Sequence, residues 1–321
     1  MTPAPGPTRL ILDCDPGHDD MVALILAARH PSLRLEAVTT VAGNAPVRDT
    51  TRNALRILRA IGSRVPVYQG ADRPLMRTQQ TAQGFHGENG LASAGAELPP
   101  CDEAPAPGHA VEAIIRLVEA SPGEITVVTT GPMTNLALAL RLRPELARRV
   151  RRIAFMGGST GAGNVTPAAE FNIWADAEAA RIVLESGAPL AMFGLNVTHQ
   201  ARLTPAHVER VRRSGGRLCE PLADLLTFYL ETSARHFGER ELGAPLHDPC
   251  PVAYLARPEL FEMQALPVQV VTDGGSAYGM TLCDTRVLPP ERDDRKRNVE
   301  VAVRVDAAGF AELVLGALEG L

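Results

Sequence analysis

The chain has 321 residues, of which 45% are hydrophobic and 21% charged, with a net charge of −5. This ordinary composition gives no basic surface for nucleic acid or anionic lipid, and no apolar run is long enough to span a membrane. The five cysteines are widely spaced without a Cys-x-x-Cys pair, which favours reduced thiols and a cytoplasmic location. Residues 1–8 are Pro-rich and are expected to form a disordered lead-in to one domain over residues 9–321.

The first predicted elements enclose a cluster of acids. The apolar run Leu10–Leu12 predicts a buried strand, and residues 21–28 predict an apolar helix. Between them, residues 13–20 read Asp-Cys-Asp-Pro-Gly-His-Asp-Asp, so four carboxylates fall within eight positions. Helix capping and the helix dipole account for Asp19 and Asp20 but not for Asp13 and Asp15 as well. A hard divalent cation with oxygen ligands accounts for all four.

Strands and helices then alternate along most of the chain. Further strands are expected at residues 33–41, 65–68, 124–130, 152–156 and 189–193, and helices at 47–61, 110–120, 133–142, 175–186, 204–213, 221–237, 250–256 and 310–318. This alternation predicts an α/β fold with an open, mostly parallel, Rossmann-like sheet flanked by helices. Residues 268–305 are expected to add a few antiparallel strands. The long loop over residues 70–108 is typical of a functional segment.

Polar residues gather where these strands end. Asn44, Thr130 and the segment Asn164–Asn172 follow three different strands, at the sheet edge where open α/β proteins bind ligands. A single such Asn is usually a turn residue, but the set matches the donors and acceptors that a polyol needs. His247-Asp248 precedes a Pro that opens a helix. Asp248 is therefore either an ordinary N-cap or a remote metal ligand, with His247 as an acid.

An ordered series of motifs resembles the inosine-uridine preferring nucleoside hydrolase family over nearly the whole chain. The family's Asp-x-Asp-Pro-Gly-x-Asp-Asp motif corresponds to residues 13–20. The later blocks are Thr40-Val41-Ala42-Gly43-Asn44, His86-Gly87-Glu88-Asn89-Gly90, Thr130-Gly131-Pro132-Met133-Thr134-Asn135, Met156-Gly157-Gly158 with Gly163-Asn164, Glu170-Phe171-Asn172 and His247-Asp248-Pro249. The resemblance implies the family's fold and the cleavage of ribonucleosides into ribose and nucleobase.

The resemblance also implies a role for each matching residue. Ca²⁺ would be held by Asp15, Asp20, Asp248 and the backbone carbonyl of Thr130, and Asp15 would deprotonate the water bound to it. The ribose would be held by Asp19, Asn44, Asn164, Glu170 and Asn172, and the transition state would resemble an oxocarbenium ion. Phe171, His86, Tyr229 and His236 would line the substrate site, with His247 as the acid for the leaving group. Assembly as a homodimer or homotetramer and a place in purine and pyrimidine salvage are likewise implied.

Two other functions remain open at this point. A metal-dependent phosphohydrolase could use Asp13 and Asp15, although that chemistry needs downstream phosphate-binding residues that the sequence does not place. A nucleoside-binding protein without catalysis is the second alternative, and the intact acids at every motif position argue against it. The sequence does not rank the nucleobases.

Overall fold

The computed structural model describes residues 6–238, 242–289 and 294–321. Its centre is an eight-stranded sheet with the order β3-β2-β1-β4-β5-β6-β12-β9. All neighbouring strands in it are parallel except the pair β12 and β9 at one edge. The expected α/β architecture, with antiparallel strands toward the C-terminus, is therefore confirmed. The expectation of one domain over residues 9–321 stays a prediction; β1 begins at Thr8, and residues 1–5 lie outside the described residues.

The first half of the chain carries most of the parallel strands. Its elements are β1 (Thr8–Cys14), α1 (His18–Arg29), β2 (Leu33–Thr40), α2 (Val47–Ala60), β3 (Val67–Gln69), α3 (Gln83–His86), α4 (Ala110–Ala120), β4 (Ile125–Thr129), α5 (Thr134–Leu142), α6 (Leu146–Arg149) and β5 (Arg152–Met156). The long loop expected over residues 70–108 contains the one-turn helix α3.

The second half completes the sheet and adds helices around it. Its elements are α7 (Phe171–Ala175), α8 (Ala177–Leu184), β6 (Leu190–Phe193), α9 (Leu195–Thr198), β7 (Arg202–Leu203), α10 (Pro205–Arg212), α11 (Cys219–Phe237), β8 (Ala244–Pro245), α12 (Pro249–Ala256), η2 (Pro258–Leu260), β9 (Phe261–Leu266), β10 (Val268–Val270), β11 (Thr281–Cys283), β12 (Val299–Val305) and α13 (Ala307–Leu318). Among the described residues, no helix is both long and apolar enough to cross a membrane.

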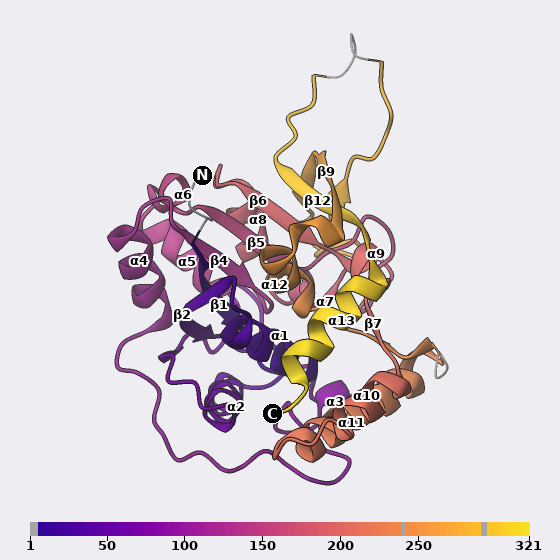
Figure 1. Ribbon diagram of the computed structural model, residues 1–321. Coiled ribbons are helices and arrows are strands. Elements are labelled where there is room, and N and C mark those ends of the chain that lie inside the picture. Colours follow the sequence, from indigo (N-terminus) through magenta and orange to yellow (C-terminus); the bar gives the residue numbers. More distant parts are fainter. Residues whose placement is uncertain (1–5, 239–241, 290–293) are drawn as a thin grey trace, which may run out of the picture.

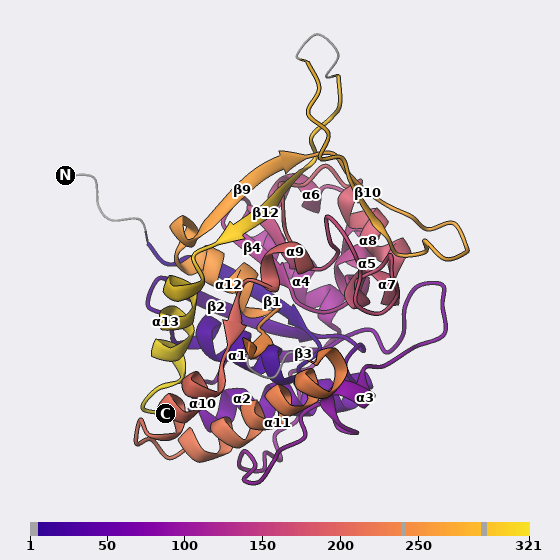
Figure 2. The ribbon, with the colours of Figure 1, turned by 90° about the vertical axis from the view of Figure 1, so that its right-hand side faces the viewer.

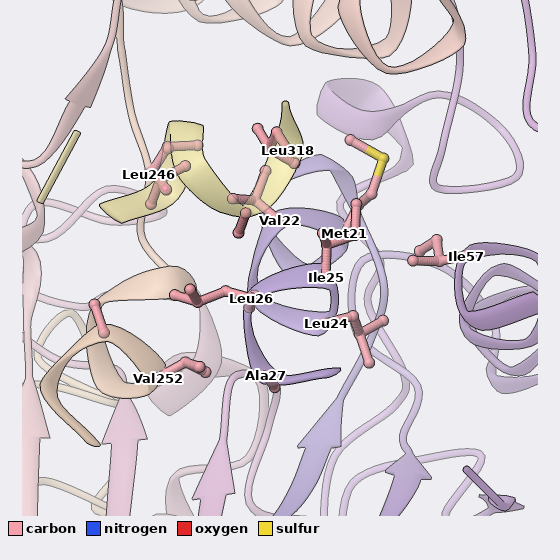
Figure 3. Close-up of a cluster of buried hydrophobic side chains, with 14 of the residues drawn as sticks. Met21, Val22, Leu24, Ile25, Leu26, Ala27, Ile57, Leu246, Val252 and Leu318 are labelled. Carbon is pink, nitrogen blue, oxygen red and sulfur yellow. The ribbon is translucent and has the colours of Figure 1, made fainter. Parts of the chain in front are cut away.

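Helices cover both faces of the sheet (Figures 1 and 2). Along β1, Leu10 and Leu12 belong to the core cluster shared with α1, α2, α12 and α13, while Ile11 belongs to the cluster shared with α4, α5 and α8. Residues 21–27 of helix α1 are apolar on all sides, so this part of the helix is buried inside the first cluster. Figure 3 shows its side chains packed against Ile57, Val252 and Leu318 from three other helices. This burial fixes the N-terminus of α1, which carries Asp19 and Asp20.

The strand order places the candidate site. Strand β1 lies between β2 and β4, and the chain continues from β1 to β2 on one side and reaches β4 on the other only after α4. The order in which the chain adds strands to the sheet reverses between β1 and β4. Open α/β sheets bind ligands in the crevice beyond the carboxyl ends of the two strands at such a reversal. At this point the Asp13 carbonyl of β1 accepts the Thr130 N–H at 2.8 Å, and Asp15 lies beside Gly131 in the loop after β4.

Candidate active site

The acidic motif forms the buried turn between β1 and α1. Asp13 is fully buried, and its Oδ1 accepts hydrogen bonds from Thr39 Oγ1 at 2.6 Å and Asn135 Nδ2 at 2.8 Å. These partners come from the neighbouring strand β2 and from helix α5. Burial raises the pKa of Asp13 to about 7, and the two hydrogen bonds oppose that rise. Asp13 thus links β1 to β2 and α5 through hydrogen bonds.

Asp15 lies in a close-fitting cradle of backbone. Its Oδ2 accepts the backbone N–H of Asn44 at 2.7 Å, whereas its Oδ1 is buried without a hydrogen-bond partner. A Cβ atom added to Gly43 would lie 2.0 Å from Oδ2, and one added to Gly131 would lie 2.5 Å from Oδ1. The two loops after β2 and β4 therefore close on the carboxylate from both sides. The free Oδ1 is a buried acceptor available to a cation or to a water proton.

Three more carboxylates share one small space. Asp19, Asp20 and Asp248 each offer an oxygen, and these oxygens lie within 4.8 Å of one another. Asp20 is held by Thr130 Oγ1 at 2.7 Å and by the backbone N–H of Gly17 at 3.0 Å. Asp248 occupies the N-cap position of α12 but makes no capping hydrogen bond with its side chain. Its carboxylate is thus directed to the cluster rather than to its own helix. Ordinary helix capping therefore does not explain the Asp248 side chain.

The cluster has no basic side chain to pair with its carboxylates among the described residues. No ion pair within the described ranges joins Asp15, Asp19, Asp20 or Asp248 to Lys or Arg. Burial and then the charge of Asp20 raise the pKa of Asp15 well above its ordinary value, and burial and then the charge of Asp19 do the same to Asp248. The pKa of Asp19 rises to about 7 for the same two kinds of reason. Buried acids that raise one another's pKa and bring their oxygen atoms close together suit a hard divalent cation such as Ca²⁺.

The geometric cluster and the ligand set implied by the resemblance overlap without being identical. Asp20 and Asp248 belong to both, whereas the cluster contains Asp19 where the implied set contains Asp15. The Thr130 carbonyl, the fourth implied ligand, accepts a hydrogen bond from Asn172 Nδ2 at 2.7 Å. The identity of the ligands therefore stays a prediction.

A cavity of about 390 Å³ opens above this cluster. Among its lining residues are the predicted site residues Asp19, Asn44, His86, Thr130, Asn164, Glu170, Phe171, Asn172, Tyr229, His236, His247 and Asp248. Asp15 and Asp20 are fully buried and do not line the cavity. The structure thus brings together, around one space, residues that lie more than 200 positions apart in the chain.

One end of the cavity is polar and firmly held. The Glu170 carboxylate caps α7 by accepting the backbone N–H groups of Asn172 and Ile173 at 2.9 and 3.2 Å, and it also accepts the N–H of Gly158, after β5, at 2.9 Å. Burial nevertheless raises its pKa to about 7. Asn164 Oδ1 accepts the backbone N–H of Phe171 at 3.0 Å. These bonds fix the side chains predicted to hold the ribose.

The other end is aromatic and is built mainly by α3 and α11, which lie next to each other (Figures 1 and 2). The Phe85 ring centroid lies 5.7 Å from that of Tyr229 and 5.2 Å from that of His236. Tyr229 is buried, and its hydroxyl donates to the Pro245 carbonyl at 2.6 Å. Tyr229 therefore presents its ring to the cavity, whereas Phe237 at the end of α11 is 53% exposed at the rim.

The two histidines of the cavity are held by neighbours. His247 Nδ1 lies 2.7 Å from Thr198 Oγ1, and His86 Nδ1 lies 3.0 Å from His18 Nδ1. Burial lowers the pKa of His247 to about 3, with nearby His199 adding to the effect, and it lowers the pKa of His86 well below the ordinary value. Both rings are therefore neutral near pH 7. A neutral imidazole donates a hydrogen bond from one nitrogen and accepts one at the other.

The sequence-based assignment of site residues missed several residues. Phe85, Phe237 and Met156 line the cavity, and Thr198 contacts one of the residues that do. Phe85 and Phe237 each adjoin a predicted histidine, so aromatic residues next to site histidines were the available signal. Thr198 follows a predicted strand at the same polar edge of the sheet as Asn44 and Thr130, which is a sequence signal, but its contact with His247 is visible only in the folded chain. Cys14 and Cys250 are buried with raised pKa values, as expected of packing residues rather than nucleophiles.

Comparisons with known proteins identify the family to which this chain belongs. The sequence model of the inosine-uridine preferring nucleoside hydrolase family matches residues 10–312. The pyrimidine-specific ribonucleoside hydrolase RihA of Salmonella paratyphi A is 45% identical over 313 residues, which cover 97% of this chain and 98% of that protein. The pyrimidine-specific ribonucleoside hydrolase RihB of Shigella sonnei is 40% identical over 312 residues, 97% of each chain.

Solved structures show the same relationship. A purine-preferring ribonucleoside hydrolase from Gardnerella vaginalis superposes with a TM-score of 0.89 at 32% identity, over 97% of this chain and 98% of that one. The plant nucleoside hydrolase PpNRh1 gives a TM-score of 0.89 at 33% identity, over 98% of this chain and all of that one (100%). The chain therefore belongs to the inosine-uridine preferring nucleoside hydrolase family and is a hydrolase that acts on N-glycosyl bonds.

Proposed function

We propose that this enzyme hydrolyses the N-glycosidic bond of ribonucleosides, giving ribose and the free nucleobase, with Ca²⁺ held by its buried aspartates. One observation carries the proposal beyond family membership. Three carboxylates share a space of ligand size at the floor of a cavity whose walls are polar at one end and aromatic at the other. A nucleoside has the same division into a sugar rich in hydroxyl groups and a flat, partly apolar base.

The cation would be held by Asp15, Asp20 and Asp248 together with the Thr130 carbonyl, and Asp19 lies close enough to contribute. When bound, Ca²⁺ supplies positive charge that offsets the carboxylates and lowers the pKa of water at this place. The unpartnered Oδ1 of Asp15 supports its role as the base, since a buried acceptor without a partner is free to take a proton.

The protein's own groups account for the remaining steps. Asp19, Asn44, Asn164, Glu170 and Asn172 hold the ribose hydroxyls and orient the anomeric carbon C1′. As the bond from C1′ to the base nitrogen breaks, its electron pair leaves with the base and positive charge develops on the sugar. The surrounding carboxylates stabilise that oxocarbenium-like charge. Water adds its oxygen to C1′ and gives a proton to Asp15.

The aromatic end would receive the nucleobase among His86, Tyr229 and His236, with His247 directed at the leaving group. Phe171 would line the substrate site from α7. We propose pyrimidine ribonucleosides as the preferred substrates. The curated relatives at 40–46% identity are named pyrimidine-specific, whereas the structural neighbour at 32% identity is named purine-preferring. Higher identity over a similar share of the chain favours the first group.

Ribose release from a panel of uridine, cytidine, inosine and adenosine tests this function. A reducing-sugar assay is run on enzyme that has been exhaustively chelated and then divided into portions with and without Ca²⁺. We expect turnover of uridine and cytidine that Ca²⁺ restores. Absence of ribose from all four nucleosides would refute the hydrolase proposal, and full turnover after chelation would refute the role of the cation.

Three further attributes belong to the same proposal. Assembly as a homodimer or homotetramer is expected by resemblance and is measured by light scattering of the purified enzyme. A place in nucleoside salvage follows from the products, a sugar and a reusable base. The cytoplasmic location is supported by the five cysteines, all of which are free thiols.

A further inference from the structure

The contact between His247 and Thr198 determines which nitrogen of the histidine ring carries hydrogen. Thr198 Oγ1 and His247 Nδ1 lie 2.7 Å apart, and Thr198 is fully buried. Since His247 lines the cavity and its Nδ1 is engaged by Thr198, Nε2 is the nitrogen left for the substrate. The positions of the hydroxyl hydrogen and the ring hydrogen follow from the requirement that each buried donor has an acceptor.

The Thr198 hydroxyl has a single hydrogen-bond partner within the described part of the chain, and that partner is His247 Nδ1. If Nδ1 carried the hydrogen, it would donate to Thr198, and the buried hydroxyl hydrogen would have no acceptor. If the hydroxyl donates instead, every buried donor in the contact is satisfied. A buried unsatisfied donor is costly, so the second arrangement is favoured. It leaves Nδ1 bare and places the ring hydrogen on Nε2.

The fold holds both partners rigidly. Thr198 lies in α9, directly after β6, and its backbone N–H donates to the Gly194 carbonyl at 3.1 Å. The segment after α9 pairs with the segment before His247 through the short strands β7 and β8, and the Leu246 N–H donates to the Ala201 carbonyl at 2.7 Å. Two strand segments thus bring positions 198 and 247 together in one fixed geometry.

We infer that Thr198 is a positioning residue that donates its hydroxyl hydrogen to His247 Nδ1 and so holds Nε2 as an N–H donor to the leaving nucleobase. This inference rests on the proposed function. The electron pair of the broken C1′–N bond stays on the base, the Nε2–H hydrogen bond stabilises it, and the base takes its proton from solvent after release. His247 therefore acts on the leaving group through the hydrogen that Thr198 keeps on Nε2.

Variants of Thr198 separate this role from simple packing. Thr198→Val keeps the shape and removes the hydroxyl, and Thr198→Ser keeps the hydroxyl. Loss of one preorganised hydrogen-bond donor to developing negative charge costs about 100-fold or more, so we expect His247→Ala to lower kcat on uridine by that amount. Thr198→Val leaves the ring in place, and we expect it to lower kcat by about tenfold. Thr198→Ser should stay within about twofold of the parent enzyme. Adding Thr198→Val to His247→Ala should cause little further loss, because both act through one hydrogen bond.

The leaving group provides the decisive comparison. p-Nitrophenyl ribofuranoside releases a stable anion that needs no hydrogen bond, so Thr198→Val should cleave it at nearly the parent rate while losing activity on uridine. Equal losses on both substrates would overturn the inference and show a structural role. Cleavage of uridine by the parent enzyme tests the proposed function separately, so the two can fail independently.

The tautomer is also directly measurable in the parent enzyme with Ca²⁺ present. Nitrogen-15 NMR of the histidine rings, with His247 assigned by its loss in His247→Ala, distinguishes a protonated Nε2 from a protonated Nδ1. We expect hydrogen on Nε2 and a bare Nδ1. Hydrogen on Nδ1, or on both nitrogens at pH 7, would overturn the inference even if every variant folded poorly.

Discussion

Asp15 keeps one carboxylate oxygen engaged and the other free. Oδ2 accepts the Asn44 N–H at 2.7 Å, and Oδ1 is buried without a partner. An orphaned acceptor of this kind costs free energy in the folded protein and persists where function uses it. The arrangement orients the carboxylate through one oxygen and leaves the other unpaired, as the base proposed for the reaction requires.

Asp15→Asn tests that role. The amide has nearly the same shape but cannot accept a proton, so we expect kcat to fall about 100-fold or more, the scale of a lost positioned base. Ribose release from uridine measures the effect. Asp49→Asn is the matched control, because Asp49 is also buried but pairs with Arg52 on α2 instead of facing the site. Parent-like turnover in Asp15→Asn would remove Asp15 from the mechanism.

The sequence predicts site residues that lie within one local motif, but it does not predict which residues far along the chain contact them. The crowding of four acids in residues 13–20 indicated a cation site without any knowledge of the fold. That Asp248 points away from its own helix is visible only in the structure, since its sequence context equally suits a cap. Residues 228 positions apart, such as Asp20 and Asp248, meet only because α12 packs against α1.

The loops after β2 and β4 enclose the Asp15 carboxylate from two sides. Gly43 and Gly131 have no side chain at the places where a Cβ would lie within 2.0 and 2.5 Å of Asp15 oxygens. The neighbouring strands are in parallel register with β1, which brings the two loops to the same height. The glycines are thus required by close approach and not by an unusual backbone conformation.

Gly131→Ala tests this arrangement at the level of the strand ends. The added methyl group displaces the Asp15 carboxylate, and a misplacement of about 1 Å costs on the order of 100-fold in rate. We expect kcat on uridine to fall by about 10- to 100-fold, as measured by steady-state kinetics. Gly316→Ala in α13 is the control, since its Cβ meets nothing within 4 Å. A Gly131→Ala enzyme with parent kcat would show that the carboxylate tolerates movement.

Element prediction succeeded where hydrophobic periodicity is strong. The apolar run after the acidic motif predicted α1, and the β-branched run before Thr130 predicted β4, as observed. The loop over residues 70–108 lacks periodicity, so its helix α3 and the placement of Phe85 beside α11 were not foreseen. Such a segment is positioned by tertiary contacts, which leave little trace in local sequence.

The stability of the whole molecule depends on pH because its site contains buried acids with shifted pKa values. In the metal-free protein, burial raises the pKa values of Asp13, Asp19 and Glu170 to about 7, from ordinary values of 3.8 for Asp and 4.5 for Glu. Between about pH 4 and pH 7 the folded state therefore binds more protons than the unfolded chain. The contribution of these groups to the free energy of unfolding is fully present below pH 4 and is lost as pH rises through 7.

A bound cation reverses this trend, because it stabilises the ionised acids in the folded state only. At a free concentration one hundred times its Kd, a ligand specific to the folded state adds about 2.7 kcal/mol. Protons compete for the same carboxylates, so the stabilisation by Ca²⁺ should be greater at pH 8 than at pH 5. Differential scanning fluorimetry with chelator or excess Ca²⁺ at the two pH values measures the change in Tm. Asp248→Asn should lose most of the increase at pH 8 and Asp49→Asn should retain it. An equal increase in Tm at both pH values, or the same increase in Asp248→Asn as in the parent, would contradict cation binding at the buried cluster.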